Sequence, residues 1–189
     1  MTVPPSSDTA PRLRTARTSE LSARDIAAAR AILWAAFPEG EEGFTEDDWQ
    51  HGLGGMHFLL EVRGELVAHG SVVEREIHIA RRPLRAGYME SVGVMPSLQG
   101  RGYGSLVAAA ATAYIREGFE VGVLGTGRHS FYERLGWRTW RGPSSVRTSS
   151  GEERTPDEDG YILVLETPSS PPLDSSAPIS CDWRPGDVW

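Results

Sequence analysis

The sequence predicts a single domain of the α/β (α+β) class, and three observations support this prediction. Apolar runs at 56–62 and 66–74, split by Arg63-Gly64-Glu65, have the pattern of an antiparallel hairpin. A hydrophobic strand, a glycine-rich loop and an alanine-rich helix follow one another over 87–118. The chain has 189 residues, of which 39% are apolar, so it can bury one core of ordinary size.

The first part of the chain predicts a tail followed by a capped helix. Residues 1–15 are rich in Pro, Ser and Thr, so we expect disorder there and one domain over 16–189. Ser22 and Asp25 have the spacing of a capping box, with Asp in place of the usual Glu or Gln. Apolar residues then recur at helical spacing as far as Pro38, which predicts an amphipathic helix.

An acidic stretch at 39–48 has two interpretations. The simpler one is a solvated loop that leads into a short capped helix over 45–51, and the other is a role of its carboxylates in binding. After the hairpin, 75–82 predicts a third strand. Pro83 then marks a turn into a fourth strand at 87–94.

The second half of the chain predicts two helices and several strands. A helix over 105–118 has one face that we expect to pack on the sheet, made of Leu106, Ala109, Ala110, Ala113 and Tyr114. The other expected elements are a strand at 119–124, a short helix at 130–135, strands at 137–140, 144–147 and 161–166, and a polar loop over 149–160. The segment 181–189 holds two tryptophans and two aspartates, so we expect it to pack back on the domain.

Composition limits the possible partners. The formal net charge of −7 argues against a general nucleic-acid binder. It suits a cationic ligand, although acidity that serves solubility alone is the simpler explanation. Because no apolar run is long enough to cross a bilayer, we expect no membrane partner.

The single cysteine, Cys181, indicates a reducing compartment, since it cannot form an internal disulfide. The first residues have neither the basic start nor the apolar run of a signal peptide, so we expect a cytoplasmic protein. Cys181 is a weak candidate for an acyl-carrying nucleophile, because no histidine lies near it in the sequence.

The glycine-rich loop predicts a phosphate site. Gly100, Gly102 and Gly104 allow the main chain to approach a ligand, and the first turn of the following helix has free amides. Arg101 adds a charge-assisted donor. The loop is no Walker A motif, because the chain has no lysine, and it lacks the third glycine of a Rossmann fingerprint. A glycine-rich connection without a ligand remains the alternative.

Two motifs together resemble the GCN5-related N-acetyltransferase (GNAT) superfamily. They are Gln99-x-x-Gly102-x-Gly104 and the downstream segment Ser130-Phe-Tyr-Glu-Arg-Leu-Gly-Trp137. Four further segments resemble the aminoglycoside 2′-N-acetyltransferases of that superfamily, namely 43–57, 87–94, 154–160 and 181–189. The resemblance covers about residues 25–189.

This resemblance implies a GNAT fold, whose central sheet is mixed, mostly antiparallel, flanked by helices and splayed at the strand that binds acetyl-CoA. It also implies a homodimer and no metal. A bulge near 92–94 belongs to the family pattern, and it frees main-chain groups that can donate to an oxyanion. The implied acetyl-CoA ligands are Val92, Gly93, Val94, Gln99, Gly100, Arg101, Gly102, Tyr103 and Gly104.

Two residues match the catalytic positions of the family. Glu90 matches the candidate base, which removes a proton from the amine through water, and Tyr132 matches the candidate acid, which protonates the departing thiolate. Each residue also has a non-catalytic interpretation. In that interpretation, Glu90 is a carboxylate that only holds substrate, and Tyr132 is an amphipathic core residue.

An aminoglycoside is polycationic, and the resemblance implies a pocket of carboxylates and main-chain groups for it. The implied ligands are Asp48, Glu90, Ser91, Gly125, Asp157, Glu158, Asp187 and Trp189, the last with its terminal carboxylate. The sequence departs from the family at Gly43, where an acidic residue is expected although Glu42 is adjacent. It also departs at Gly125, where a serine is expected, and at Glu158, where Asp is expected.

The implied reaction is transfer of the acetyl group of acetyl-CoA to the 2′-amine of an aminoglycoside by direct attack. Two alternatives stay open. In the first alternative, the protein acetylates another polycationic amine, a metabolite or a protein amine. In the second, it binds coenzyme A or the drug and catalyses no reaction. An assay of acetyl transfer across a panel of amines distinguishes the three hypotheses.

Overall fold

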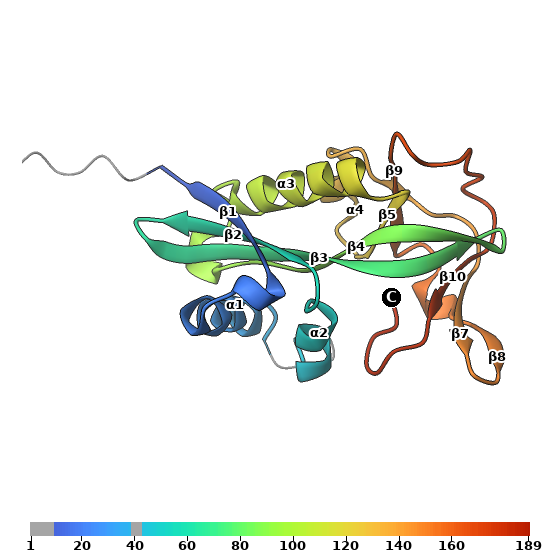
Figure 1. Cartoon of the computed structure of the whole chain (residues 1–189), viewed down its shortest axis with the longest axis horizontal. Coiled ribbons are helices and arrows are strands. Elements are labelled where there is room, and N and C mark those ends of the chain that lie inside the picture. The colour runs from blue at the N-terminus through green and yellow to red at the C-terminus, as the bar shows by residue number, and fades with distance from the viewer. Residues whose placement is uncertain (1–9, 39–42) are drawn as a thin grey trace, which may run out of the picture.

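A computed structural model describes residues 10–38 and 43–189 (Figure 1). Its α-helices are α1 (Ala23–Ala36), α2 (Glu46–His51), α3 (Tyr103–Gly118) and α4 (His129–Glu133). Its strands are β1 (Arg12–Arg17), β2 (Met56–Val62), β3 (Glu65–Ile79), β4 (Arg82–Val94), β5 (Val121–Gly125), β6 (Arg138–Thr139), β7 (Ser144–Thr148), β8 (Gly151–Arg154), β9 (Ile162–Glu166) and β10 (Ile179–Asp182). Three short 3₁₀ turns, η1 (Thr18–Glu20), η2 (Pro96–Leu98) and η3 (Pro156–Glu158), complete these elements.

The strands form one mixed sheet in the order β6-β9-β5-β4-β3-β10-β7-β8. Strand β2 also pairs with β3, and β1 pairs with β2. The β4–β5 and β7–β10 pairs are parallel, and the other pairs are antiparallel. The predicted fold class, a mixed and mostly antiparallel sheet flanked by helices, is confirmed.

A long hairpin of β3 and β4 forms the centre of the sheet. The prediction of a separate third strand at 75–82 was wrong, because β3 continues to Ile79 and β4 starts at Arg82. Ala80 and Arg81 make the turn with φ of 50° and 66°. Non-glycine residues adopt this left-handed conformation at a cost, so the sequence carries no hairpin signal there.

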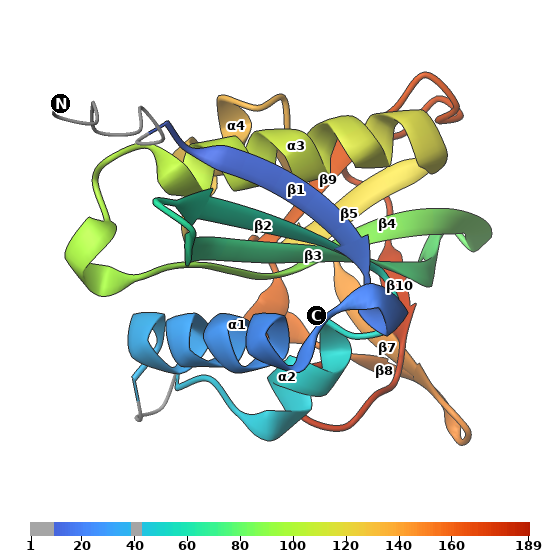
Figure 2. The same cartoon turned by 60° about the vertical axis from the view of Figure 1, so that its left-hand side comes forward.

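The two faces of the sheet are covered by different helices (Figure 2). α3 lies on one face, and α1 and α2 lie on the other. The predicted packing face of α3 was only partly right. Ala110 and Tyr114 pack against the core, but the fully buried side chains are Val107, Ala108, Ala111, Thr112 and Ile115, and Leu106 is 47% exposed. Small residues surround this helix on all sides, so its sequence lacks a distinct apolar stripe.

Capping boxes begin both helices on the opposite face, as predicted. The Ser22 hydroxyl accepts from the amide of Asp25 at 3.1 Å, and Thr45 does the same for Asp48 at 3.3 Å. These local hydrogen bonds satisfy amides that have no intrahelical partner. The predictions for 39–42, Glu42 included, lie outside the described residues.

Two predicted irregular segments are partly regular. We expected disorder over 1–15, but residues 12–15 belong to β1, which pairs with β2 from Arg12 to Arg17, while 1–9 lie outside the described residues. The polar loop expected at 149–160 contains β8 and η3. β1 pairs with the distant strand β2, and β8 forms a hairpin with its neighbour β7, so strand pairing outweighs a polar composition in both segments.

The C-terminal segment packs on the domain, as predicted. Strand β10 lies between β3 and β7, and the side chain of Trp189 is 4% exposed. The Trp189 indole donates to Thr155 Oγ1 at 3.0 Å. Within 10–38 and 43–189, no helix is both long and apolar enough to cross a bilayer.

Candidate active site

The site begins where two neighbouring strands separate. β4 pairs with β5 only over Ala86–Tyr88 and Val121–Val123. Beyond this point β4 carries a bulge, because its register against β3 jumps from Glu90 to Gly93 while β3 advances only from Ser71 to His69. Ser91 sits in the bulge with φ of 54°. The bulge predicted near 92–94 therefore begins slightly earlier, at Ser91.

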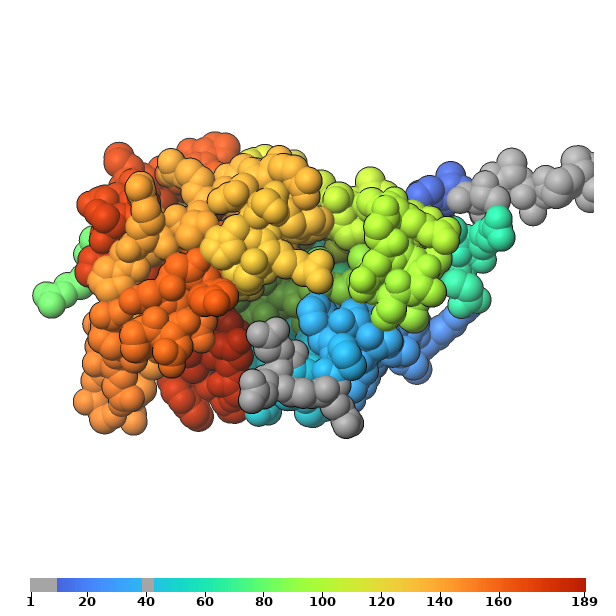
Figure 3. All heavy atoms as spheres, turned by 180° about the vertical axis from the view of Figure 1, so that it is seen from behind, coloured from blue at the N-terminus to red at the C-terminus, as the bar shows by residue number. Residues whose placement is uncertain are grey.

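A cleft of about 760 Å³ opens at this separation. Figure 3 shows it from behind as a hollow between α1, the α4 segment and the C-terminal segment. It brings together the following predicted residues: Asp48, Glu90, Ser91, Val92, Gly93, Val94, Gln99, Gly100, Gly102, Tyr103, Gly104, Gly125, Tyr132, Asp187 and Trp189. The lining does not include Arg101, Asp157 or Glu158.

One end of the cleft is the start of α3. Gly102 is the N-cap of this 16-residue helix and has φ of 82°, and Gly100 has φ of 76°. No atom lies within 4 Å of where a side chain would begin at either glycine, so their main chain is open to a ligand. Free amides and the helix dipole favour an anion at such an end.

The centre of the cleft holds a buried ion pair. Glu90 Oε1 accepts from Nη1 of Arg184 at 2.6 Å, and each side chain is 14% exposed. Burial raises the pKa of Glu90, while the charge and hydrogen bond of Arg184 lower it. Among the hydrogen bonds of the described residues, none involves Oε2 of Glu90, so this oxygen is available to a ligand.

Arg184 also holds the C-terminal segment in the cleft. Its Nε donates to the carbonyl of Asp187 at 2.8 Å, and its Nη2 lies 3.5 Å from the main-chain oxygen of Trp189. A methyl group at Gly125 would lie 3.3 Å from the carbonyl carbon of Trp189. The main chain of Trp189 therefore lies against the end of β5.

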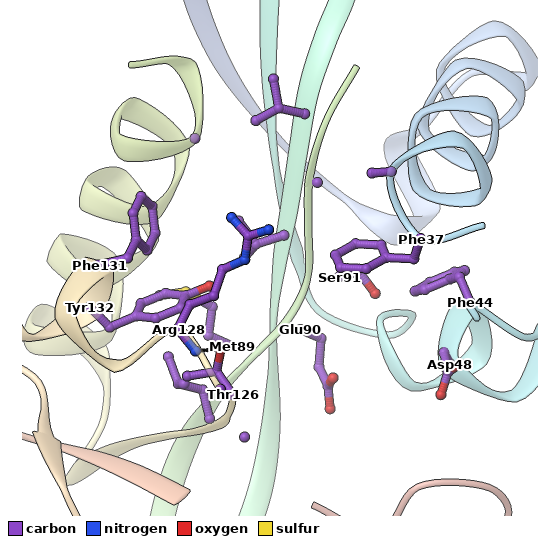
Figure 4. Close-up of a pocket in the computed structure, with 18 of the residues that line it drawn as sticks. Phe37, Phe44, Asp48, Met89, Glu90, Ser91, Thr126, Arg128, Phe131 and Tyr132 are labelled. Atoms are coloured by element: carbon purple, nitrogen blue, oxygen red, sulfur yellow. Dashed lines mark hydrogen bonds between the residues drawn. The ribbon is translucent and has the colours of Figure 1, made fainter. Parts of the chain in front are cut away.

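Tyr132 reaches the cleft from α4. Figure 4 shows Phe131, Tyr132 and Arg128 on one side of β4, with Asp48 and Phe44 on the other and Glu90 between them. Tyr132 is 8% exposed, and burial raises its pKa far above the ordinary value while the Arg128 charge lowers it. Tyr132 therefore carries its proton over the whole physiological range.

The acidic side of the cleft is made by segments distant in sequence. Asp48 lines it from the first turn of α2, where its carboxylate also accepts a hydrogen bond from the amide of the N-cap residue, Thr45. Asp187 lines it from the C-terminal segment. Burial, followed by the charges of Asp187 and Asp157, raises the pKa of Glu158. Glu158 thus lies in the same negative field although it is outside the lining.

Cys181 lies outside the cleft. Its side chain is buried and its Sγ donates to the carbonyl of Val188 at 3.2 Å. Burial raises the pKa of this thiol, which opposes formation of a thiolate nucleophile. Among the described residues, no group of three or more His, Cys, Asp or Glu side chains could hold a metal ion.

Sequence reasoning missed several lining residues. Arg184, Arg128 and His51 line the cleft, and the His51 ring donates to the carbonyl of Pro185 at 2.7 Å. Arg184 and His51 stand inside the resembling segments 181–189 and 43–57, which are the signal in the sequence for both. No local pattern marks Arg128.

Comparisons with known proteins show which family the chain resembles. The model of the acetyltransferase (GNAT) family matches residues 26–137. The chain is 40% identical over 185 residues to an aminoglycoside 2′-N-acetyltransferase of Mycolicibacterium fortuitum. The match covers 94% of this chain and 93% of that protein.

Two solved structures show the same fold. One is a GNAT family acetyltransferase from Brucella melitensis in complex with acetyl-CoA, with a TM-score of 0.62, 18% identity and coverage of 90% of this chain and 95% of that chain. The other is the GNAT family N-acetyltransferase YhbS from Escherichia coli in complex with CoA, with a TM-score of 0.62, 13% identity and coverage of 90% and 89%. The identity to the M. fortuitum enzyme extends along nearly the whole of both chains, and the GNAT family model matches more than half of this chain. The protein therefore belongs to the aminoglycoside 2′-N-acetyltransferases of the GNAT family.

Proposed function

We propose that the protein transfers the acetyl group of acetyl-CoA to the 2′-amino group of aminoglycosides by direct attack of the amine. The observation that carries this proposal is the position of Glu90. Its buried carboxylate lies where the separated strands meet the acidic side of the cleft. Family membership supports the choice of donor and acceptor.

The open glycine loop fits a pyrophosphate. The free amides at Gly102–Gly104 and the dipole of α3 would hold this group, and the unpaired edge of β4 from Ser91 to Val94 would hold an extended amide-containing arm. Arg101 is exposed at the rim, where it would add charge. When bound, acetyl-CoA supplies an acetyl group activated as a thioester.

Glu90 is the proposed base. An amino-sugar nitrogen is mostly ammonium at neutral pH, so it must lose a proton before it can attack. Oε2 of Glu90 accepts this proton through water while Arg184 holds Oε1. The pKa of Glu90 is raised by burial, which makes the carboxylate a better base than an exposed one.

Tyr132 is the proposed acid. It lies on the α4 side of the cleft and keeps a proton on its hydroxyl, which is available to a thiolate leaving group. The positive charge of Arg128 favours the tyrosinate that remains after the proton is given up.

The acceptor site is the acidic half of the cleft. Asp48, Glu90 and Asp187 place carboxylates around it, and Trp189, whose indole is packed in the core, offers its main-chain oxygens. Asp157 and Glu158 extend the negative field beyond the lining. The main chain at Ser91 and Gly125 completes the proposed set of ligands.

Two further proposals rest on the family resemblance. We infer a homodimer from the resemblance alone. Light scattering on the purified protein tests this state. We infer a cytoplasmic location, with which the free thiol of Cys181 agrees.

A matched pair of substrates tests the reaction. Kanamycin B has an amine at the 2′ position and kanamycin A has a hydroxyl there. We expect release of free coenzyme A with kanamycin B, with the acetyl group on the 2′ nitrogen by NMR, and only background release with kanamycin A. Equal turnover of both compounds contradicts the 2′ assignment, and turnover of unrelated amines alone favours a different acceptor.

A further inference from the structure

A chain of buried polar groups outside the cleft leads to the bulge of β4. His57 on β2 and His69 on β3 are 1% and 0% exposed. The Nδ1 atom of His57 lies 2.9 Å from Nε2 of His69, and Nδ1 of His69 lies 2.9 Å from the carbonyl oxygen of Ser91. At the other end, Nε2 of His57 lies 2.8 Å from the hydroxyl of Thr18. The site described above uses neither histidine.

The two ends of this chain decide the direction of every hydrogen bond. A carbonyl only accepts, so Nδ1 of His69 carries a proton. Burial lowers the pKa of both histidines to about 4, so each ring is neutral and has one proton. Nε2 of His69 therefore accepts from Nδ1 of His57, whose Nε2 accepts from the Thr18 hydroxyl. Thr18 in turn accepts from the amide of Gly54 at 2.8 Å.

The group at the inner end is strained and lies in the cleft. Ser91 has φ of 54°, a left-handed conformation that is unfavourable for a residue with a Cβ atom. The bulge takes Ser91 out of the regular pairing with β3, so the carbonyl of Ser91 needs another donor. His69 is that donor, and it stabilises the conformation of the bulge.

The orientation of one carbonyl also sets the orientation of an amide. The peptide group that joins Ser91 to Val92 is planar and trans, so its N–H points opposite to its C=O. The C=O points to the ring of His69, so the N–H points away from that ring. Val92 itself lines the cleft, where β4 and β5 have separated.

We propose that His69, oriented by His57, is a positioning residue for acetyl transfer, because it fixes the Ser91–Val92 peptide with the Val92 amide directed into the opening between β4 and β5. This inference rests on the proposed function. An amide held there can donate to the carbonyl oxygen of the donor as negative charge develops on it. His57 acts one step further away by keeping His69 in the required tautomer.

Variants at His69 test the proposal. In H69L the donor is lost and the peptide is free to rotate, so we expect kcat to fall about 10- to 100-fold, somewhat less than for removal of an oxyanion donor. The KM for acetyl-CoA should change little. In H69N the side-chain amide nitrogen takes the place of Nδ1, and most of kcat should return. H57L should give a smaller loss through the same route, and it serves if H69L does not fold.

T112V is the matched control for a lost buried hydrogen bond. Thr112 is 2% exposed and accepts from the Trp137 indole at 2.9 Å, away from the bulge. We expect T112V to lower Tm and to leave kcat unchanged at 25 °C. If T112V and H69L lower Tm equally and kcat equally, or if H69N performs no better than H69L, the role of His69 is structural and the proposal is wrong.

A spectroscopic measurement separates this inference from the proposed function. Side-chain ¹H–¹⁵N NMR of the wild-type protein should place the proton of both histidines on Nδ1, with or without any substrate. A proton on Nε2 of His69 contradicts the hydrogen-bond chain. If both Nδ1–H groups are observed but no amine accepts an acetyl group, the proposed function fails, the role of His69 in acetyl transfer fails with it, and only the hydrogen-bond chain stands.

Discussion

At the scale of single residues, the chemistry depends on two opposite effects on the pKa of Glu90. Burial raises this pKa and favours the neutral acid, and the Arg184 guanidinium at 2.6 Å lowers it and favours the carboxylate. A base needs both influences, since it must be ionised at rest and still accept a proton. Tyr132 has the complementary task, because its raised pKa keeps it protonated until a stronger base forms beside it.

Removing either proton-transfer group should reduce turnover with little change in the fold. For E90Q we expect kcat/KM to fall at least about 100-fold, and Y132F should lower kcat to a similar extent. Initial rates of coenzyme A release measure both effects. E65Q is the control, because Glu65 is 78% exposed and outside the cleft. A double variant, E90Q with Y132F, that keeps normal turnover means that other residues move the protons.

The pH profile tests the Glu90–Arg184 pair. R184Q removes the influence that lowers the pKa of Glu90, so this pKa should rise further. The acidic limb of kcat/KM should therefore move to higher pH in the variant. The amine has the same pKa with both enzymes, so a shift of the limb belongs to the protein. A limb that stays in place or moves to lower pH contradicts the pairing.

At the scale of elements, two local devices prepare the site. One is the bulge in β4, which ends its pairing with β5 and exposes main-chain groups. The other is the left-handed N-cap of α3 at Gly102, which turns the loop so that the first amides of the helix face the cleft. Both devices use backbone conformations that ordinary side chains resist.

A substitution at Gly102 should weaken cofactor binding selectively. G102A forces a residue with a Cβ atom into φ of 82°, at a cost of about 1 to 2 kcal/mol. If the loop relaxes to avoid this strain, the KM for acetyl-CoA should rise about 5- to 30-fold. G118A, at the other end of the same helix, meets no atom within 4 Å and should leave this KM unchanged. Equal KM values for the two variants argue against the loop as the phosphate site.

At the scale of the whole molecule, distant segments close one cleft. The α1–α2 region supplies Asp48, the centre of the sheet supplies Glu90, α4 supplies Tyr132, and the C-terminal segment supplies Asp187. The long β3 strand connects these regions, because it pairs with β2 and β10 along one edge and with β4 along the other. Stability of the sheet and integrity of the site are therefore linked.

The buried histidine pair makes this stability depend on pH. His57 and His69 have a pKa of about 4 in the folded protein and an ordinary value of 6.5. Their contribution to the free energy of unfolding is thus fully present above pH 6.5 and is lost as the pH falls toward 4. Linkage gives a loss of roughly 2 kcal/mol per histidine at pH 5. Urea unfolding at pH 7.5 and pH 5 measures it.

The double variant H57N with H69N is the comparison for this measurement. Glu90 has a raised pKa, so its own contribution changes in the opposite direction as the pH falls. That contribution is common to both proteins and cancels in the difference between them. If the double variant loses as much stability between pH 7.5 and pH 5 as the wild type, the histidine pair does not cause the loss.

The sequence by itself determined the features that depend on near neighbours in the chain. The capping boxes at Ser22 and Thr45, the turn at Gly64 and the loop that ends at Gly104 were readable because a few adjacent residues decide each one. Resemblance in longer segments then indicated the roles of Glu90 and Tyr132, which remain proposals.

Only the tertiary structure decided which distant groups meet. Arg184 pairs with Glu90 across 94 positions of sequence, and His69 reaches the Ser91 carbonyl only because the bulge turns it out of the ladder. The buried face of α3 and the continuation of β3 to Ile79 were likewise set by packing against the sheet. The physical reason is that register, bulge position and burial are properties of paired strands, and no single segment carries them.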